Sequence, residues 1–124
     1  MATTSVYGLC LLFLFCLFLQ GNSQCTGKEN LKVSQAPTGK LIQNKPEFNV
    51  TIYNDCICTE LNVYLGPEDF HTVEPIDPKI LAKTPLGWLV NDGQPIYGNK
   101  SFSFTYAWNY QFNFVPVGAT RACS

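Results

Sequence analysis

The chain has little of what most enzymes and nucleic-acid-binding proteins need. Its 124 residues include one histidine, His71, and its 8 basic and 9 acidic residues give a formal net charge of −1. Because no basic stripe is present, nucleic acid and anionic membrane surfaces are not expected partners. No serine lies in a nucleophile-elbow pattern, and no thiol is expected to be free. These absences predict a protein that is not an enzyme and that uses no cofactor.

Acidic and metal-ligating side chains are also sparse. The densest acidic group lies in a proline-rich segment and consists of Glu68, Asp69, Glu74 and Asp77. Two carboxylates can hydrolyse a glycosidic bond, but acids on a segment of this kind usually form a solvated face, so no catalytic pair is expected. The lone His71 and the Cys56-x-Cys58 spacing match no zinc pattern, so no metal site is expected either.

The N-terminus carries a short apolar run, from Tyr7 to Leu19. It has no charge and is too short to span a bilayer comfortably. Gly21 and Ser23 follow in the arrangement of a signal-peptidase site. The basic start of a signal peptide is missing, and a membrane anchor is the alternative. We expect residues 1–23 to be a signal peptide, residues 24–124 to form one secreted domain, and no membrane insertion after cleavage.

Removal of a signal peptide would leave four cysteines in the mature chain, namely Cys25, Cys56, Cys58 and Cys123. In an oxidising compartment, four cysteines in a small domain indicate two disulfides. Same-face neighbours on a strand lie about 6.6 Å apart, so a Cys56–Cys58 bridge would be strained. Cys25 and Cys123 are therefore each expected to reach the Cys-x-Cys pair, and which of them takes which cysteine stays open.

Aromatic residues alternate with small or polar ones near the C-terminus. Every even position is aromatic, comprising Phe102, Phe104, Tyr106, Trp108, Tyr110, Phe112 and Phe114. This period of two predicts strands with one buried face. Because thirteen residues are long for one strand, we expect two strands broken near Asn109-Tyr110. The rings are expected to be core, with an exposed platform at Trp108 and Tyr110 as the alternative.

Shorter alternating or apolar stretches indicate further strands at residues 31–35, 47–53, 61–65 and 86–90. A turn is expected at residues 36–39, a short helical turn at Pro78 to Lys83, and reversals at residues 91–93 and at Gly98-Asn99. Short strands separated by glycine and proline are typical of an antiparallel β-sandwich. The predicted fold is therefore an all-β, disulfide-stabilised sandwich of about seven or eight strands.

Two N-glycosylation sequons are present, Asn49-Val50-Thr51 and Asn99-Lys100-Ser101. The second follows a turn glycine and should be accessible. The first lies in a predicted strand whose alternation turns Phe48, Val50 and Ile52 inward and leaves Asn49 facing outward. Asn49 and Asn99 are both candidate glycosylation sites.

Several motifs together resemble the plant tapetum determinant family. They are the Asn54-Asp55-Cys56-x-Cys58 step, Phe70-x-x-x-Glu74-Pro75-x-Asp77-Pro78, the run from Leu89 to Ile96, Ser103-Phe104-x-Tyr106-Ala107 and the terminal Cys123. The resemblance implies a small secreted cysteine-rich protein of the apoplast. It further implies a signalling ligand that binds the ectodomain of a leucine-rich-repeat receptor kinase and specifies cell fate.

The chain departs from that family pattern in its cysteines. Six mature cysteines are usual in the family, one near the position of Leu65-Gly66 and one just before Leu89, where this chain has Trp88. The loss of both together is what removal of one bridge would produce.

A carbohydrate-binding module of the plant cell wall is the alternative function. Exposed aromatic rings on a β-sandwich can stack on sugar faces, and the end of the chain loosely resembles modules attached to plant cellulases. Under that alternative, Trp88, Trp108 and Tyr110 would share a flat exposed face that binds cell-wall polysaccharide. The same three residues are the candidate binding residues of the chain.

Overall fold

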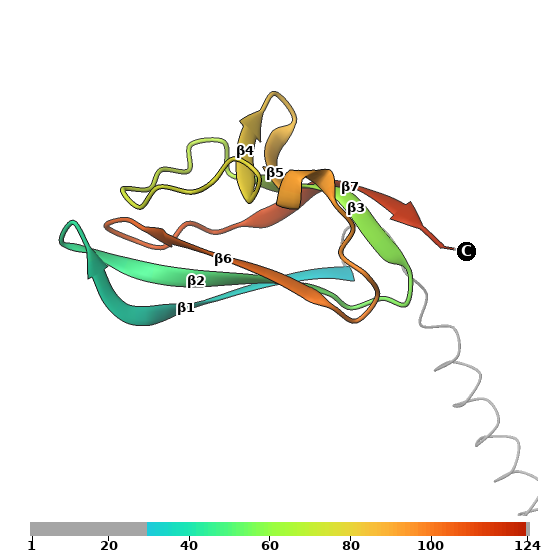
Figure 1. Ribbon diagram of the computed structural model, residues 1–124, viewed down its shortest axis with the longest axis horizontal. Coiled ribbons are helices and arrows are strands. Elements are labelled where there is room, and N and C mark those ends of the chain that lie inside the picture. The colour runs from blue at the N-terminus through green and yellow to red at the C-terminus, as the bar shows by residue number, and fades with distance from the viewer. Residues whose placement is uncertain (1–29, 124) are drawn as a thin grey trace, which may run out of the picture.

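The computed structural model describes residues 30–123 (Figure 1). Its elements are β1 (Leu31–Ile42), β2 (Lys45–Asn54), β3 (Thr59–Gly66), β4 (Leu81–Thr84), β5 (Gly87–Val90), the 3-10 turn η2 (Asn91–Gly93), β6 (Ser101–Ala107) and β7 (Val115–Ala122). Seven strands and no α-helix within this described part confirm the predicted all-β class.

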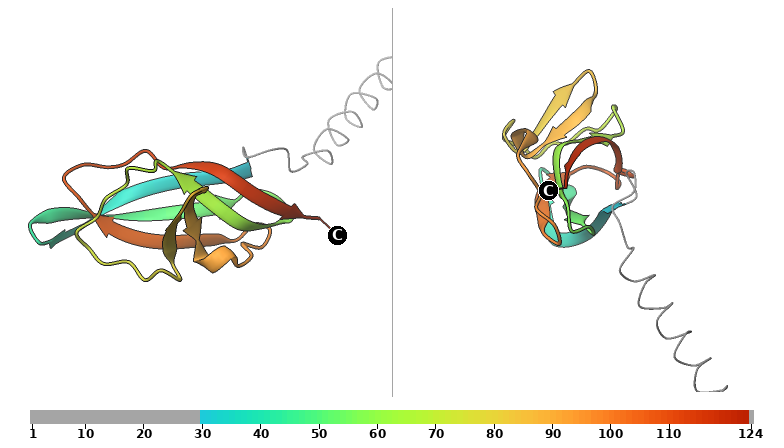
Figure 2. Two further views of the ribbon diagram at one scale, coloured as in Figure 1. Left: turned by 90° about the horizontal axis from the view of Figure 1, so that it is seen from above. Right: turned by 90° about the vertical axis from the view of Figure 1, so that its right-hand side faces the viewer.

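The strands form two antiparallel sheets, one of three strands in the order β1-β2-β6 and one of four in the order β4-β5-β3-β7. The two sheets pack as a sandwich. The β1–β2 hairpin lies at one end of the molecule, and the C-terminal end of β7 lies at the other (Figures 1 and 2). The β4–β5 hairpin rises from the four-stranded sheet, away from the three-stranded sheet.

Strand β2 shows why the sequence folds as a sheet here. Phe48, Val50 and Ile52 are buried at alternate positions, as the sequence predicted. β2 is the central strand of its sheet, and Val50 pairs with Phe104 of β6. Since successive side chains point to opposite faces, this register aligns the apolar faces of the two strands toward one core.

The rings of the core gather around one residue of the long β3–β4 connection, Phe70. Its ring lies edge-on or nearly so to four others, at centroid distances of 5.0 to 5.2 Å, and these are Trp88, Tyr106, Phe112 and Phe114. Edge-to-face pairs contribute about 0.5–1.5 kcal/mol each beyond area burial. Phe70 is 3 % exposed, so this irregular connection supplies the centre of the core.

The aromatic segment follows the prediction in its first half only. Residues 101–107 form β6, but residues 108–114 are irregular, and the next strand begins at Val115. The second predicted strand is therefore wrong, although the break near Asn109-Tyr110 is confirmed. The cause is a side-chain network: the Tyr106 hydroxyl donates to Gln35 Oε1 at 2.6 Å and accepts from Phe112 N at 3.0 Å. Gln35 also donates to the Phe112 carbonyl oxygen, so both backbone polar groups of Phe112 bond to side chains instead of a strand ladder.

Two local predictions are also wrong. The chain does not turn at residues 36–39, because β1 continues to Ile42 with a register shift between Pro37 and Leu41. The strand tolerates Pro37 because β1 is an edge strand, where a missing N–H costs no ladder bond. The reversal falls at Gln43 and Asn44, whose φ angles are 50° and 65°.

The predicted helical turn at Pro78 to Lys83 is replaced by a turn followed by a strand. Backbone N–H groups of Ile80 and Leu81 donate to the Asp77 carbonyl at 2.8 and 3.1 Å. β4 then begins at Leu81 and pairs with β5. A four-residue strand with one buried side chain gives too little alternation to be predicted from sequence.

Candidate functional site

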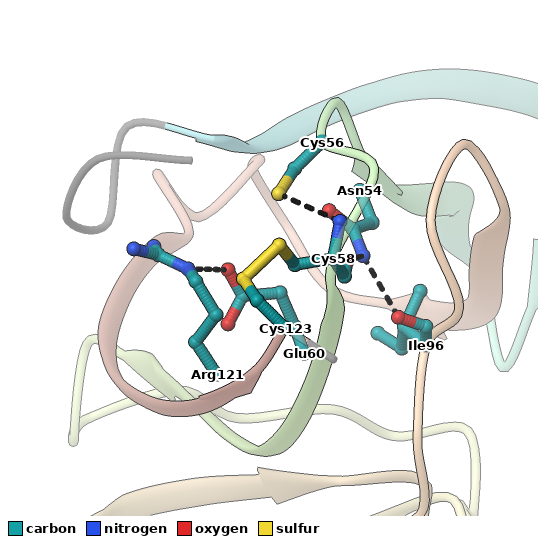
Figure 3. The surroundings of a disulfide bond; sticks show 7 residues. All are labelled: Asn54, Cys56, Cys58, Glu60, Ile96, Arg121 and Cys123. Carbon is teal, nitrogen blue, oxygen red and sulfur yellow. Dashed lines mark hydrogen bonds and ion pairs between the residues drawn. A yellow bond between two sulfur atoms is a disulfide. The ribbon is translucent and has the colours of Figure 1, made fainter. Parts of the chain in front are cut away.

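The C-terminal end of the sandwich is held by cysteines (Figure 3). Cys58, just before β3, is bonded to Cys123, just after β7, with Cα atoms 4.7 Å apart. Cys56 is also disulfide-bonded, and its Sγ accepts a hydrogen bond from Cys58 N at 3.2 Å. The structure thus resolves the open pairing for Cys123. Cys25 and the proposed signal peptide lie outside the described residues, so the pairing of Cys25 with Cys56 stays a prediction.

Buried polar groups surround this bridge. The Asn54 amide donates to the carbonyl oxygens of Cys58 and Ile96, both at 2.8 Å. Arg121 Nε donates to Glu60 Oε1 at 3.0 Å, and Glu60 is 1 % exposed. Figure 3 shows these groups converging beside the sulfur atoms. Because buried polar groups are costly unless they are paired, this end is a rigid structural clamp.

The three candidate binding rings have different surroundings. Trp88 is half-buried against Phe70, and Trp108 is half-buried with its ring edge-on to His71 at 5.6 Å. Tyr110 is 58 % exposed and lies 5.1 Å from the ring of Phe112. Within residues 30–123, no ring contact joins any two of the three. Their role in binding stays a prediction.

A cavity of about 160 Å³ opens beside Trp88, lined by Glu68, Lys83, Thr84, Pro85, Gly87 and Trp88. Lys83 Nζ lies 5.9 Å from the centroid of the Trp88 ring, within range of a cation–π attraction. The cavity therefore combines one aromatic wall with groups of both charges.

A second, larger groove of about 310 Å³ contains one of the two sequons. It is lined by Asn49, Pro75, Ile76, Asp77, Ile80, Ser103, Phe104 and Thr105. It lies between the β3–β4 connection and the three-stranded sheet. Asn49 is half-buried there, with neighbours on both sides of the central strand.

Two neighbouring carboxyl groups, Glu47 and Glu74, lie where the β3–β4 connection meets the three-stranded sheet. Glu47 is 6 % exposed and accepts a hydrogen bond from Thr38 Oγ1 at 2.7 Å. Glu74 Oε2 accepts from Thr105 Oγ1 at 2.9 Å. The other oxygen of Glu74, Oε1, is buried and has no hydrogen-bond partner within the described residues. The two carboxyl groups therefore influence each other through their charges and their burial.

Of the two carboxyl groups, Glu74 is the one that is harder to ionise. Burial, aided by the neighbouring Glu47 carboxylate, raises the pKa of Glu74 above its usual value. The hydrogen bond from Thr38 is the largest cause holding the pKa of Glu47 below its usual value, and attraction to Lys40 adds to it. The hydroxyl of Thr105 in β6 binds Glu74 and thereby fastens the β3–β4 connection to the three-stranded sheet.

Sequence reasoning identified Glu74 in an acidic group but missed Glu47. Glu47 begins a predicted strand, and no local signal shows that a segment more than twenty residues away folds over it. The other acids of that group, Glu68, Asp69 and Asp77, are exposed.

An exposed apolar patch on the four-stranded sheet was also missed. We define the outer apolar patch as Leu86, Val115 and Val117, which are 69 %, 45 % and 40 % exposed. A Cβ atom built on Gly66 or on Gly87 would lie 3.3 or 3.1 Å from a methyl group of Val117. Because these two glycines have no side chain, the Val117 side chain can pack directly on their backbone.

The structure also limits two kinds of site. In residues 30–123, no three His, Cys, Asp or Glu side chains come together as metal ligands would. Nor does this range contain a helix that is both long and apolar enough to cross a bilayer.

Fold and bridge together define a small, disulfide-bonded, all-β sandwich domain. The family model described as "Tapetum determinant 1, C-terminal" matches residues 27–124, and the chain belongs to this family. The predicted resemblance is thereby confirmed.

Two relatives from Arabidopsis thaliana have similar sequences. The protein named TPD1 protein homolog 1 is 28% identical over 92 residues, which are 72% of this chain and 51% of that protein. An uncharacterized protein is 27% identical over 115 residues, which are 90% of each chain. The chain thus spans about half the length of the first relative and nearly all of the second. No solved structure matches the chain.

Proposed function

We propose that the protein is a secreted signalling ligand of the apoplast that binds the ectodomain of a leucine-rich-repeat receptor kinase and acts in cell-fate specification. The observation that carries this proposal is membership of the tapetum determinant family over residues 27–124. The apolar run and signal-peptidase pattern of residues 1–23 support secretion.

The geometry favours the outer apolar patch as the surface that meets the receptor. Exposed apolar side chains that are grouped together mark interaction sites on soluble proteins. Val115 and Val117 lie on β7, where the ladder between β3 and β7 holds Val115 beside Gly66, and Leu86 lies in the β4–β5 turn. Side chains that are already held in place lose little conformational entropy when a partner covers them.

Binding to a panel of leucine-rich-repeat receptor-kinase ectodomains tests the proposal. Protein collected from the medium of secreting cells is passed over immobilised ectodomains, and retention by at least one of them is expected. Val117→Lys should weaken that binding by about tenfold or more, because truncation or charging of a central contact is costly.

Leu41→Lys is the matched control for this substitution. Leu41 is 68 % exposed but lies on β1 of the other sheet, so its replacement should leave binding unchanged. Retention by none of the ectodomains would contradict the receptor proposal. Equal weakening by both lysine variants would contradict the choice of surface.

One observation favours carbohydrate binding as a second candidate. The cavity at Trp88 places an aromatic face next to Lys83 and Glu68, a combination that suits a sugar ring and its hydroxyl groups. Retardation of the protein in gels containing xylan, or its depletion by cellulose, tests this candidate. Lys83→Ala should abolish such binding, whereas Lys79→Ala, on an exposed turn, should not.

A further inference from the structure

A second group of exposed apolar side chains lies near the Cys-x-Cys end, separate from the outer apolar patch. Tyr53, Ile57 and Tyr97 are 37 %, 75 % and 60 % exposed. They come from the end of β2, from the β2–β3 connection and from the turn before β6. We call them the sequon patch, because Asn99 of the second sequon lies among them.

Backbone hydrogen bonds hold this turn against the β2–β3 connection (Figure 1). Lys100 N donates to Tyr97 O at 3.0 Å and closes a four-residue turn. Asn99 N donates to the carbonyl oxygens of Asn54 and Cys56 at 2.9 and 3.1 Å. The position of the Asn99 backbone is therefore fixed by residues beside the disulfide.

The close approach of the turn requires glycine at position 98. A Cβ atom there would lie 2.6 Å from the carbonyl oxygen of Ile57. Asn99 follows with a φ of 61°, a conformation that asparagine tolerates better than most residues. The Tyr53 hydroxyl lies 3.5 Å from Asn99 Oδ1. An exposed asparagine amide is thus held next to one tyrosine and two residues after another.

This arrangement suits a sugar attached to Asn99. One face of an N-acetylglucosamine ring consists of C–H groups and packs on aromatic rings, while its hydroxyl groups stay in water. The Asn99-Lys100-Ser101 sequence is an acceptor for N-linked glycans. A glycan at this point would cover apolar surface that is otherwise exposed to solvent.

We propose that Asn99 carries an N-linked glycan whose first sugars pack on Tyr97 and Tyr53 and cover the sequon patch. In the attachment step, Asn99 Nδ2 bonds to C1 of the first N-acetylglucosamine of a lipid-diphosphate-linked oligosaccharide. The bond between C1 and the diphosphate oxygen breaks, Nδ2 loses one proton, and the lipid diphosphate leaves. The inference rests on secretion, which is part of the proposed function.

The other sequon provides an internal comparison. Asn49 lies in the middle of the central strand β2 and faces the groove under Pro75 and Ile76. It has neither a turn nor an exposed tyrosine next to it in sequence. The effect of a glycan at Asn49 on stability would therefore not depend on Tyr97.

The first experiment measures attachment at Asn99. The full chain is expressed in a secreting eukaryotic cell, in parallel with the same chain carrying an established signal peptide in place of residues 1–23. Secreted protein is treated with peptide N-glycosidase in ¹⁸O water and mapped by mass spectrometry. We expect ¹⁸O-labelled aspartate at position 99 and its absence in Ser101→Ala. An unmodified Asn99 in secreted protein would overturn the proposal.

The version with the established signal peptide separates the test of glycan attachment from the test of the proposed function. Entry into the secretory pathway then does not depend on residues 1–23, so failure of the native signal would contradict secretion without affecting the result at Asn99. Receptor binding is measured separately on the same material. If the protein carries a glycan at Asn99 but is retained by none of the ectodomains, only the receptor proposal is contradicted.

The second experiment tests the packing of the sugars on Tyr97 by a double-mutant cycle. Ser101→Ala removes the sequon without changing Asn99, and should lower the ratio of folded to unfolded protein by about threefold to tenfold. In the Tyr97→Ser background this loss should shrink to less than half. Tyr110→Ser, which replaces an exposed tyrosine elsewhere, should leave the loss unchanged. An equal loss in the Tyr97→Ser background and in the native background would overturn the packing.

Discussion

Leu65 of β3 and Trp88 of β5 lie directly opposite each other as register partners in the antiparallel ladder. The resemblance described in the sequence analysis implies additional family cysteines at these places, near Leu65-Gly66 and just before Leu89. Leu65 is fully buried, and Trp88 packs its ring on Phe70. An apolar cross-strand pair therefore occupies the place that a bridge between β3 and β5 would take.

Replacing both residues, Leu65→Cys with Trp88→Cys, should create a disulfide. Opposite residues of an antiparallel pair have Cα atoms about 4.5–5.5 Å apart, within the range that a disulfide needs. Intact mass and thiol labelling of the oxidised protein should show no added free thiol. Leu65→Cys with Leu89→Cys is the control, because these side chains point to opposite faces. Two reactive thiols in the first variant would contradict the β3–β5 register.

Removing the Cys58–Cys123 bridge should destabilise the domain. The bond closes a loop of 65 residues, and the chain-entropy account gives about 4 kcal/mol for a loop of that size. The double variant Cys58→Ala with Cys123→Ala is therefore expected to lose about 2–4 kcal/mol in urea unfolding. Native protein with and without reductant is the control. An unchanged midpoint in the variant would show that the Glu60–Arg121 pair and the ladder hold this end without the bridge.

Phe70→Ala should be among the most damaging single substitutions in the described chain. Loss of a buried phenylalanine that contacts four rings leaves a cavity, and costs about 3–5 kcal/mol. Thermal and urea unfolding measure this loss. Tyr110→Ala, which truncates an exposed ring, should change stability by about 0.5 kcal/mol or less. Similar losses in the two variants would contradict the central place of Phe70.

Stability should fall as the pH rises above the usual carboxyl range. The folded-state pKa of Glu74 is raised above its ordinary value of 4.5. The contribution of Glu74 to the free energy of unfolding is therefore fully present below pH 4.5, and it is lost as the pH rises through the raised pKa. The lowered pKa of Glu47 acts in the opposite direction, because its contribution is lost as the pH falls through the lowered value.

Glu74→Gln isolates the first of these effects. An amide carries no charge at any pH, so this variant should keep its melting temperature between about pH 5 and about pH 8, while the native protein loses stability as Glu74 ionises. At the upper pH the variant should be the more stable by about 1 kcal/mol. Asp69→Asn, which changes an exposed acid, should follow the native pH dependence. Parallel curves for all three proteins would contradict the raised pKa of Glu74.

Much of the fold could be predicted because it depends on local patterns. Alternation in residues 47–53 correctly gave the buried face of β2, and the rings at Phe104 and Tyr106 correctly gave that of β6. β7 was missed because none of the residues Val115–Ala122 is buried, so the strand carries no alternation of apolar and polar side chains. The candidate site was less predictable, since the Glu47–Glu74 pair and the outer apolar patch each join segments from separate parts of the chain.

The class of fold, the family resemblance and the presence of a disulfide at the C-terminus could be predicted, because side-chain period, turn residues and cysteine spacing are properties of the chain. Three other features emerge only from the folded molecule: Cys123 pairs with Cys58, Phe70 lies at the centre of the rings, and Asn99 lies next to Tyr53. Each of these contacts depends on strand register and on the path of an irregular connection. Both are fixed by packing between distant residues, which no local pattern encodes.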